Sequence, residues 1–127
     1  MASILRVNTL TDASSNNSIG MSYVAEGSGK CWVQYNASTA IQDSFNTTSL
    51  TDSATGKTVW NIDSDMNNDD YAVTTSAANG DASATSSTLD PHTFATGSVS
   101  LNAFAGADTA SLSDRSHQCA MIMGDLA

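Results

Sequence analysis

A strict alternation of small polar and apolar residues runs through Ser98-Val99-Ser100-Leu101-Asn102-Ala103. Successive side chains of a strand point to opposite faces, so a period of two predicts a strand with one buried face. The same period recurs in residues 31–35, where Cys, Val and Tyr alternate with Trp and Gln, and in residues 58–62. Further strands are expected at residues 41–45, 49–51, 71–77 and 93–95.

Near the C-terminus, apolar residues occupy every position of a short run. Cys119, Met121 and Met123 interleave with Ala120 and Ile122. A continuous apolar run of this length is typical of a strand that is buried on both faces. We therefore expect residues 119–123 to form a strand with both faces buried.

Turn-forming residues separate these runs. Asn79-Gly80 favours the positive φ angles of a tight hairpin turn, and further breaks are expected at residues 55–57, Asp90-Pro91 and residues 106–108. Short strands at intervals of about 8 to 12 residues are typical of a sandwich or barrel. No stretch of helical length has an amphipathic pattern. We expect an all-β protein, an antiparallel, jelly-roll-like β-sandwich.

The first 29 residues differ from the rest because they contain little apolar material and end in the connector Gly27-Ser28-Gly29. They divide the chain into an N-terminal arm (1–29) and a β-sandwich domain (30–127). The arm is either an edge strand with a loop or an extended segment that docks on a neighbouring subunit or partner. Its apolar residues are candidates for oligomer or anchor contacts: Ile4, Leu5, Val7 and Leu10.

The charge of the chain is low and one-sided. Only 13% of residues are charged, and thirteen acidic residues against four basic ones give a net charge of −9. Proteins bind nucleic acid by neutralising phosphates with Lys and Arg, and anionic membranes select for the same residues. We therefore expect neither nucleic acid nor a membrane as a partner.

The start of the chain lacks the apolar core of a signal peptide, and no run approaches the roughly 18 apolar residues of a membrane span. We expect synthesis in a cytosol. Cys31 and Cys119 lack metal-type spacing, and in a reducing compartment both are expected to be buried free thiols. The alternative is a disulfide that joins the first core strand to the last.

The acidic run from Asp63 to Asp70 partly matches a calcium-binding loop. Oxygen-bearing residues at alternate positions suit Ca²⁺, but Asn68 stands where the loop needs Gly and Thr74 where it needs Glu. We expect a solvated connection between two strands, with adventitious binding of a divalent ion as the alternative, and no cofactor. The weak metal-ligand candidates are Asp63, Asp65, Asn67 and Asp69.

Catalytic motifs are missing from the sequence. There is no Gly-x-Ser-x-Gly elbow and no glycine-rich phosphate loop, and Glu26 is the only Glu. His92 and His117 have no Cys, His or carboxylate partners at metal-ligand spacing. We expect no catalytic residues and no enzymatic activity. The aromatic residues are expected mainly in the core, with a sugar-stacking platform as the alternative.

Several segments together resemble small virion structural proteins, often called tail-fibre-like, of marine bacteriophages. Residues 30–36 (Lys-Cys-Trp-Val-Gln-Tyr-Asn) are similar to a Lys-Ala-Trp-Val-Asn-Phe-Asn segment of that group. The likeness covers most of the chain and weakens from Ala82 to Ala110. Departures are Cys31 in place of Ala and Asn67 where the group commonly has Pro. The other matching segments are residues 4–10, 43–46, 49–52, 66–73 and 124–127.

The resemblance implies a β-sandwich module on the virion surface, made in the host cytoplasm, without catalytic residues. We expect a structural protein of a short fibre or appendage, anchored to the particle by its N-terminal arm. A capsid decoration protein and a carbohydrate-binding module for host recognition are the alternatives. The expected partners are capsid, portal, tail or fibre proteins, further copies in a homotrimer, and a host surface glycan.

Overall fold

The computed structural model describes residues 4–80, 87–106 and 111–127. Within them the chain forms a small N-terminal hairpin, a short helix and two larger sheets. The elements are β1 (Thr9–Thr11), β2 (Ser18–Gly20), α1 (Met21–Gly27), β3 (Gly29–Tyr35), β4 (Ile41–Phe45), β5 (Thr47–Ala54), β6 (Lys57–Ile62), β7 (Ala72–Ala78), β8 (Ser87–Ala95), β9 (Ser98–Ala105) and β10 (His117–Met123).

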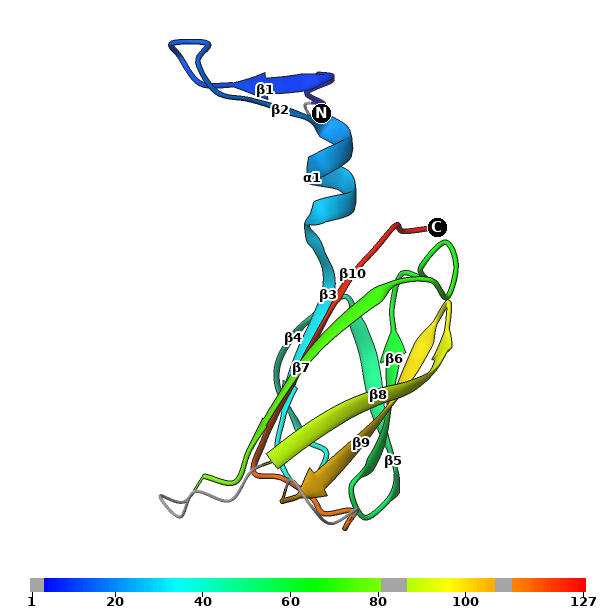
Figure 1. Ribbon diagram of the computed structural model, residues 1–127. Helices are drawn as coiled ribbons and strands as arrows, with labels where there is room; N and C mark the ends of the chain where they lie inside the picture. The colour runs from blue at the N-terminus through cyan, green and yellow to red at the C-terminus, as the bar shows by residue number, and fades with distance from the viewer. Residues whose placement is uncertain (1–3, 81–86, 107–110) are drawn as a thin grey trace.

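Two antiparallel four-stranded sheets pack against each other (Figure 1). One has the strand order β4-β3-β10-β7 and the other β5-β6-β9-β8. The first and last strands of the sandwich, β3 and β10, are neighbours in the middle of the first sheet. The prediction of an all-β antiparallel sandwich is confirmed.

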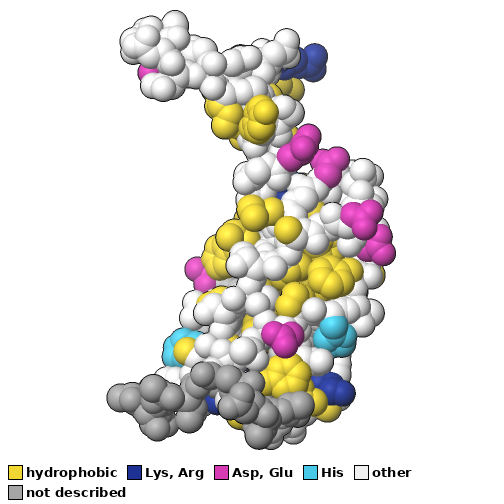
Figure 2. All heavy atoms as spheres, in the orientation of Figure 1, with side chains coloured by type: hydrophobic (Ala, Val, Ile, Leu, Met, Phe, Trp, Pro, Cys, Tyr) yellow, Lys and Arg dark blue, Asp and Glu magenta, His cyan; other side chains and the backbone are white. Residues whose placement is uncertain are grey.

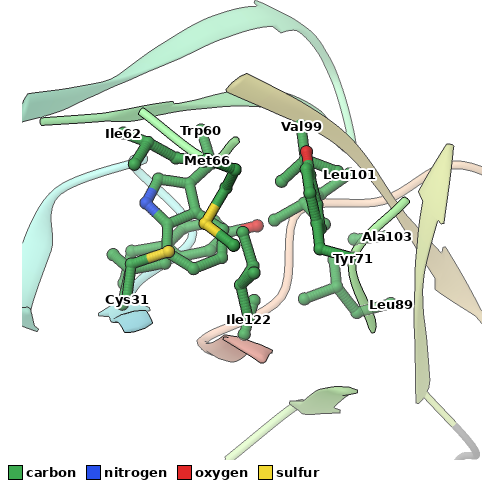
Figure 3. Packing of buried hydrophobic residues seen from close by; sticks show 13 residues of the cluster. Cys31, Trp60, Ile62, Met66, Tyr71, Leu89, Val99, Leu101, Ala103 and Ile122 are labelled. Atoms are coloured by element: carbon green, nitrogen blue, oxygen red, sulfur yellow. The ribbon is translucent and has the colours of Figure 1, made fainter. Parts of the chain in front are cut away.

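The core lies between the sheets (Figure 3). It contains apolar residues that the two-residue period assigned to the buried faces of strands. Alternate residues of β3, β6 and β9 are buried, as predicted for residues 31–35, 58–62 and 98–103. Trp60 is fully buried, and its indole Nε1 donates a hydrogen bond to Thr47 Oγ1 at 3.0 Å. The largest fully buried side chains are Trp60, Tyr35, Met66, Leu101 and Ile122.

Residues 119–123 form a strand between two others, but the expectation that both its faces are buried is wrong. β10 is buried on one face only, through Gln118, Ala120 and Ile122. Its alternate residues, which include Cys119 and Met121, face outward. Both cysteines are free, but only Cys31 is buried. The outer surface of this sheet has no second layer over it among the described residues, so the apolar run gains no second buried face.

Of the four expected turns, one is confirmed, two are not, and one falls mostly outside the described residues. Gly56, with φ of +67°, forms the turn between β5 and β6 as predicted. Asn79-Gly80 does not connect paired strands, because β7 and β8 belong to different sheets. Asp90-Pro91 lies inside β8, where the pairing with β9 is irregular beyond Pro91. Because β8 is an edge strand, the missing amide donor of proline is tolerated. The break at residues 106–108 falls mostly outside the described residues.

The N-terminal residues form neither an edge strand of the sandwich nor a fully extended segment. They fold into the β1-β2 hairpin followed by α1, and this segment stands away from the sandwich (Figure 1). In the hairpin turn, Asp12 Oδ1 accepts a hydrogen bond from Asn16 N at 3.0 Å. The Lys30 ammonium, buried at the start of β3, donates hydrogen bonds to the Ala25 carbonyl and to Ser28 Oγ. Lys30 therefore ties the end of α1 to the first strand of the sandwich.

Candidate functional site

The acidic loop lies between β6 and β7. The predicted candidates Asp63, Asp65, Asn67 and Asp69 are all exposed, whereas Met66 between them is buried in the core. The burial of Met66 alone has a simple physical reason. The loop is pinned by one large apolar side chain, and its polar neighbours point into solvent.

Backbone contacts with the C-terminal residues hold this loop in place. Asn67 N donates to Asp125 O at 2.9 Å, and Ala127 N donates to Asp65 O at 3.0 Å. Met66 and Leu126 form an isolated antiparallel bridge. Within residues 4–80, 87–106 and 111–127, no three His, Cys, Asp or Glu side chains gather as metal ligands. The loop is thus a braced connection between strands.

The two histidines make local contacts on the surface. His92 Nε2 lies 3.1 Å from Asn102 Oδ1, and its Nδ1 lies 3.0 Å from Thr93 Oγ1. His117 Nδ1 lies 3.3 Å from Ser116 Oγ. These hydroxyl and amide partners orient both imidazole rings on the surface.

The candidate contact residues of the N-terminus are exposed to solvent. The exposed fractions are 74% for Ile4, 80% for Leu5, 37% for Val7 and 42% for Leu10. Sequence reasoning missed Tyr23 of α1, which is 74% exposed. Figure 2 shows hydrophobic side chains gathered around the helix, below the hairpin and apart from the sandwich.

A second apolar surface, not predicted from the sequence, lies on the outside of the β4-β3-β10-β7 sheet. In the strand register Phe45 is opposite Trp32, and Trp32 is opposite Met121, so three neighbouring strands contribute one row of large side chains. We call Trp32, Phe45, Met121 and Met123 the outer apolar face. Their exposed fractions lie between 36% and 58%.

A shallow hollow of about 380 Å³ runs along this face. Trp32 and Met121 form its apolar wall, and small polar side chains from β3, β7 and β10 complete it. No charged side chain is among the described residues that line it. The hollow can therefore accept an apolar side chain or the flat face of a sugar ring, but it offers no acid-base pair for catalysis. The polar lining residues are Gln34, Thr74, Thr75, Ser76 and Cys119.

Comparisons with known proteins place no constraint on this chain. No family model matches it, and neither a curated protein nor a solved structure matches significantly. None of the described helical residues forms a segment of the length and apolarity needed to cross a membrane.

Proposed function

We propose that this chain is a non-enzymatic structural protein of a bacteriophage particle, a surface-exposed β-sandwich module of a short fibre or appendage. The observation that carries the proposal is the pairing of a closed sandwich core with an N-terminal segment whose apolar side chains stay exposed. Such a segment suits a protein whose N-terminus makes contacts outside its own domain. The resemblance to small virion proteins points in the same direction.

The proposed partners are other virion proteins and further copies of the chain. Apolar side chains of residues 4–10 contact the particle or a neighbouring subunit of a homotrimer. The net charge of −9 keeps the sandwich away from the packaged nucleic acid and limits unspecific association at high copy number.

The experiment is immunogold labelling of intact particles of the phage that encodes this chain, with mass spectrometry of the purified particles. Label at one appendage is expected for the fibre assignment. Label spread over the head would instead support the alternative, a capsid decoration protein. The absence of the chain from washed particles would contradict both assignments.

A carbohydrate-binding module is the second candidate, because Trp32 lines a hollow together with amide and hydroxyl side chains. An indole face flanked by hydrogen-bonding groups is suited to stack on a sugar of the host surface. Binding on a glycan array that is lost in Trp32→Ala would support this function. Binding that is also lost with chelator and in Asp65→Ala would add a calcium-assisted loop.

A further inference from the structure

Within residues 4–80, 87–106 and 111–127, two apolar surfaces lack a covering layer, and they lie on different parts of the molecule. One is the outer apolar face. The other is the N-terminal segment, residues 4–28, where Ile19 is 44% and Tyr23 is 74% exposed in addition to the apolar residues before them. Clustered exposed apolar side chains mark interaction sites rather than ordinary surface.

The N-terminal segment is also too small to be stable unsupported. Its hairpin has strands of three residues, and its helix has seven. An isolated two-stranded hairpin is marginal in water, and helices shorter than about 12 residues need tertiary packing. None of the residues of α1 is buried. The segment therefore requires a surface to pack on.

The outer apolar face of the same copy does not serve as that surface. α1 runs into β3 through Ser28, and the bonds from Lys30 to Ala25 O and Ser28 Oγ hold the end of the helix at the start of the strand. The segment consequently points away from the sandwich (Figure 1). A neighbouring copy can present its face where this copy cannot.

The charges favour a second copy of the chain as the occupant. Residues 1–29 carry Arg6 against Asp12 and Glu26, so most of the net charge of −9 lies on the sandwich. Sandwich-to-sandwich contact is thus opposed by like charge, whereas the nearly neutral segment can approach. Asp43 is exposed on the edge strand β4, two residues before Phe45 and on the same face of the sheet. Its carboxylate offers Arg6 an opposite charge.

We propose that the outer apolar face binds the N-terminal segment of a second copy, with Ile19 and Tyr23 packing against Trp32, Phe45 and Met121. A standard interface takes roughly 20–30 residues from each partner, a length that residues 4–28 match. The contact joins two different surfaces, so it closes into a ring when the rotation allows. The inference deepens the proposed function, because it names the neighbouring subunit of the trimer as the partner of the segment.

Two full-length variants test the two surfaces of the proposed contact one at a time. The face variant carries Phe45→Glu and Met121→Glu, and the segment variant carries Ile19→Glu and Tyr23→Glu. All four positions are exposed, so folding is retained, as near-ultraviolet circular dichroism will check. The control carries Ser53→Glu and Thr88→Glu on exposed positions of the other sheet, with the same added charge.

Light scattering after gel filtration then gives the mass of each species. The wild-type protein and the control are expected at three times the chain mass of 13.1 kDa, and each variant alone at the chain mass. An equimolar mixture of the two variants is expected to form a pair of twice the chain mass. In that pair the intact segment of the face variant binds the intact face of the segment variant. The two remaining surfaces are both substituted, so no ring can close.

Three results would overturn the inference. A wild-type monomer at millimolar concentration would exclude self-docking, while labelling of particles would still decide the proposed function. Assembly that survives in the segment variant would indicate contact between two faces. A monomeric wild-type protein that binds a glycan through Trp32 would assign the face to sugar recognition.

Discussion

Met121 on β10 lies directly opposite Trp32 on β3, and both side chains leave the outer surface of the same sheet. Both residues belong to segments that look like core strands in the sequence. Their neighbours Ile122 and Val33 are fully buried on the inner surface. One sheet therefore carries two apolar surfaces, of which only the inner is covered by the second sheet.

The two tryptophans are expected to differ in their contributions to stability. Trp60 is fully buried and donates a hydrogen bond to Thr47, whereas Trp32 is 36% exposed. Trp60→Phe is expected to lower the free energy of unfolding by about 1–3 kcal/mol, through lost packing and a lost hydrogen bond. Trp32→Phe should change it by less than about 0.5 kcal/mol. Urea unfolding of the monomer will compare them, and equal losses would contradict the burial difference.

The two thiols are expected to react differently in the folded monomer, in which the outer apolar face is uncovered. Cys119 is exposed, while burial raises the pKa of Cys31 to about 11. The thiolate is the reactive form, so a thiol reagent should label one cysteine per chain at pH 8 and two in denaturant. Cys119→Ser should abolish native labelling. Labelling of Cys31 at the rate of Cys119 would contradict the prediction.

The same geometry opposes a disulfide between the two cysteines. Cys119 pairs with Gln34 and Cys31 with Ile122, so the thiols lie three register positions apart and on opposite surfaces of one sheet. A disulfide requires side chains that point toward each other. Non-reducing mass analysis of oxidised monomer should find no intramolecular bond.

Glycines 56 and 27 form a matched pair for a test of backbone strain. A Cβ atom at Gly56 would lie 2.6 Å from Ser113 N and 2.7 Å from Ala103 O, at a φ of +67°. Gly56→Ala is therefore expected to cost about 1–3 kcal/mol or more. At Gly27 a Cβ atom would meet nothing within 4 Å, so Gly27→Ala should be neutral or slightly stabilising. Thermal unfolding of both variants checks that Gly56→Ala has the lower melting temperature.

Alkaline pH is expected to destabilise the fold. Burial raises the pKa of Cys31 from 9.0 to about 11 and that of Tyr35 from 10.0 to about 12. From about pH 9 to 12 the unfolded chain binds fewer protons than the folded one, so the free energy of unfolding falls as pH rises. The contribution is complete below pH 9 and is lost as pH passes the folded-state values.

Single substitutions can assign this pH dependence to its groups. Cys31→Ala should flatten the decline from about pH 9 to 11, and Tyr35→Phe should flatten it from about pH 10 to 12. Urea unfolding at stepped pH measures both slopes. Ser53→Ala, at an exposed position without a titratable side chain, is the control and should leave the decline unchanged.

Removal of calcium is expected to leave the stability unchanged. A site with a dissociation constant of about 10 μM would add about 2.7 kcal/mol at 1 mM Ca²⁺ by mass action. The exposed oxygens of Asp63, Asp65 and Asp69 do not converge, so the melting temperature should be equal with Ca²⁺ and with chelator. A rise with Ca²⁺ that disappears in Asp65→Ala would establish a metal site.

Local alternation was sufficient to predict β3, β6 and β9, because a period of two assigns inner and outer positions without knowledge of the neighbours. The turn at Gly56 was predicted from the glycine itself, since a positive φ is a local requirement that glycine meets without strain. The all-β class followed from the number and spacing of such strands.

Only the tertiary structure decided the rest. In residues 119–123 every position is apolar, so no period distinguished the faces, and the covering sheet selected Ala120 and Ile122 for burial. The outer apolar face combines Phe45, Trp32 and Met121 from three strands that become neighbours only through long-range pairing. The apolar alternation and the spacing of turns determined that a β-sandwich forms, whereas the pairing of distant strands determined which apolar side chains stay uncovered.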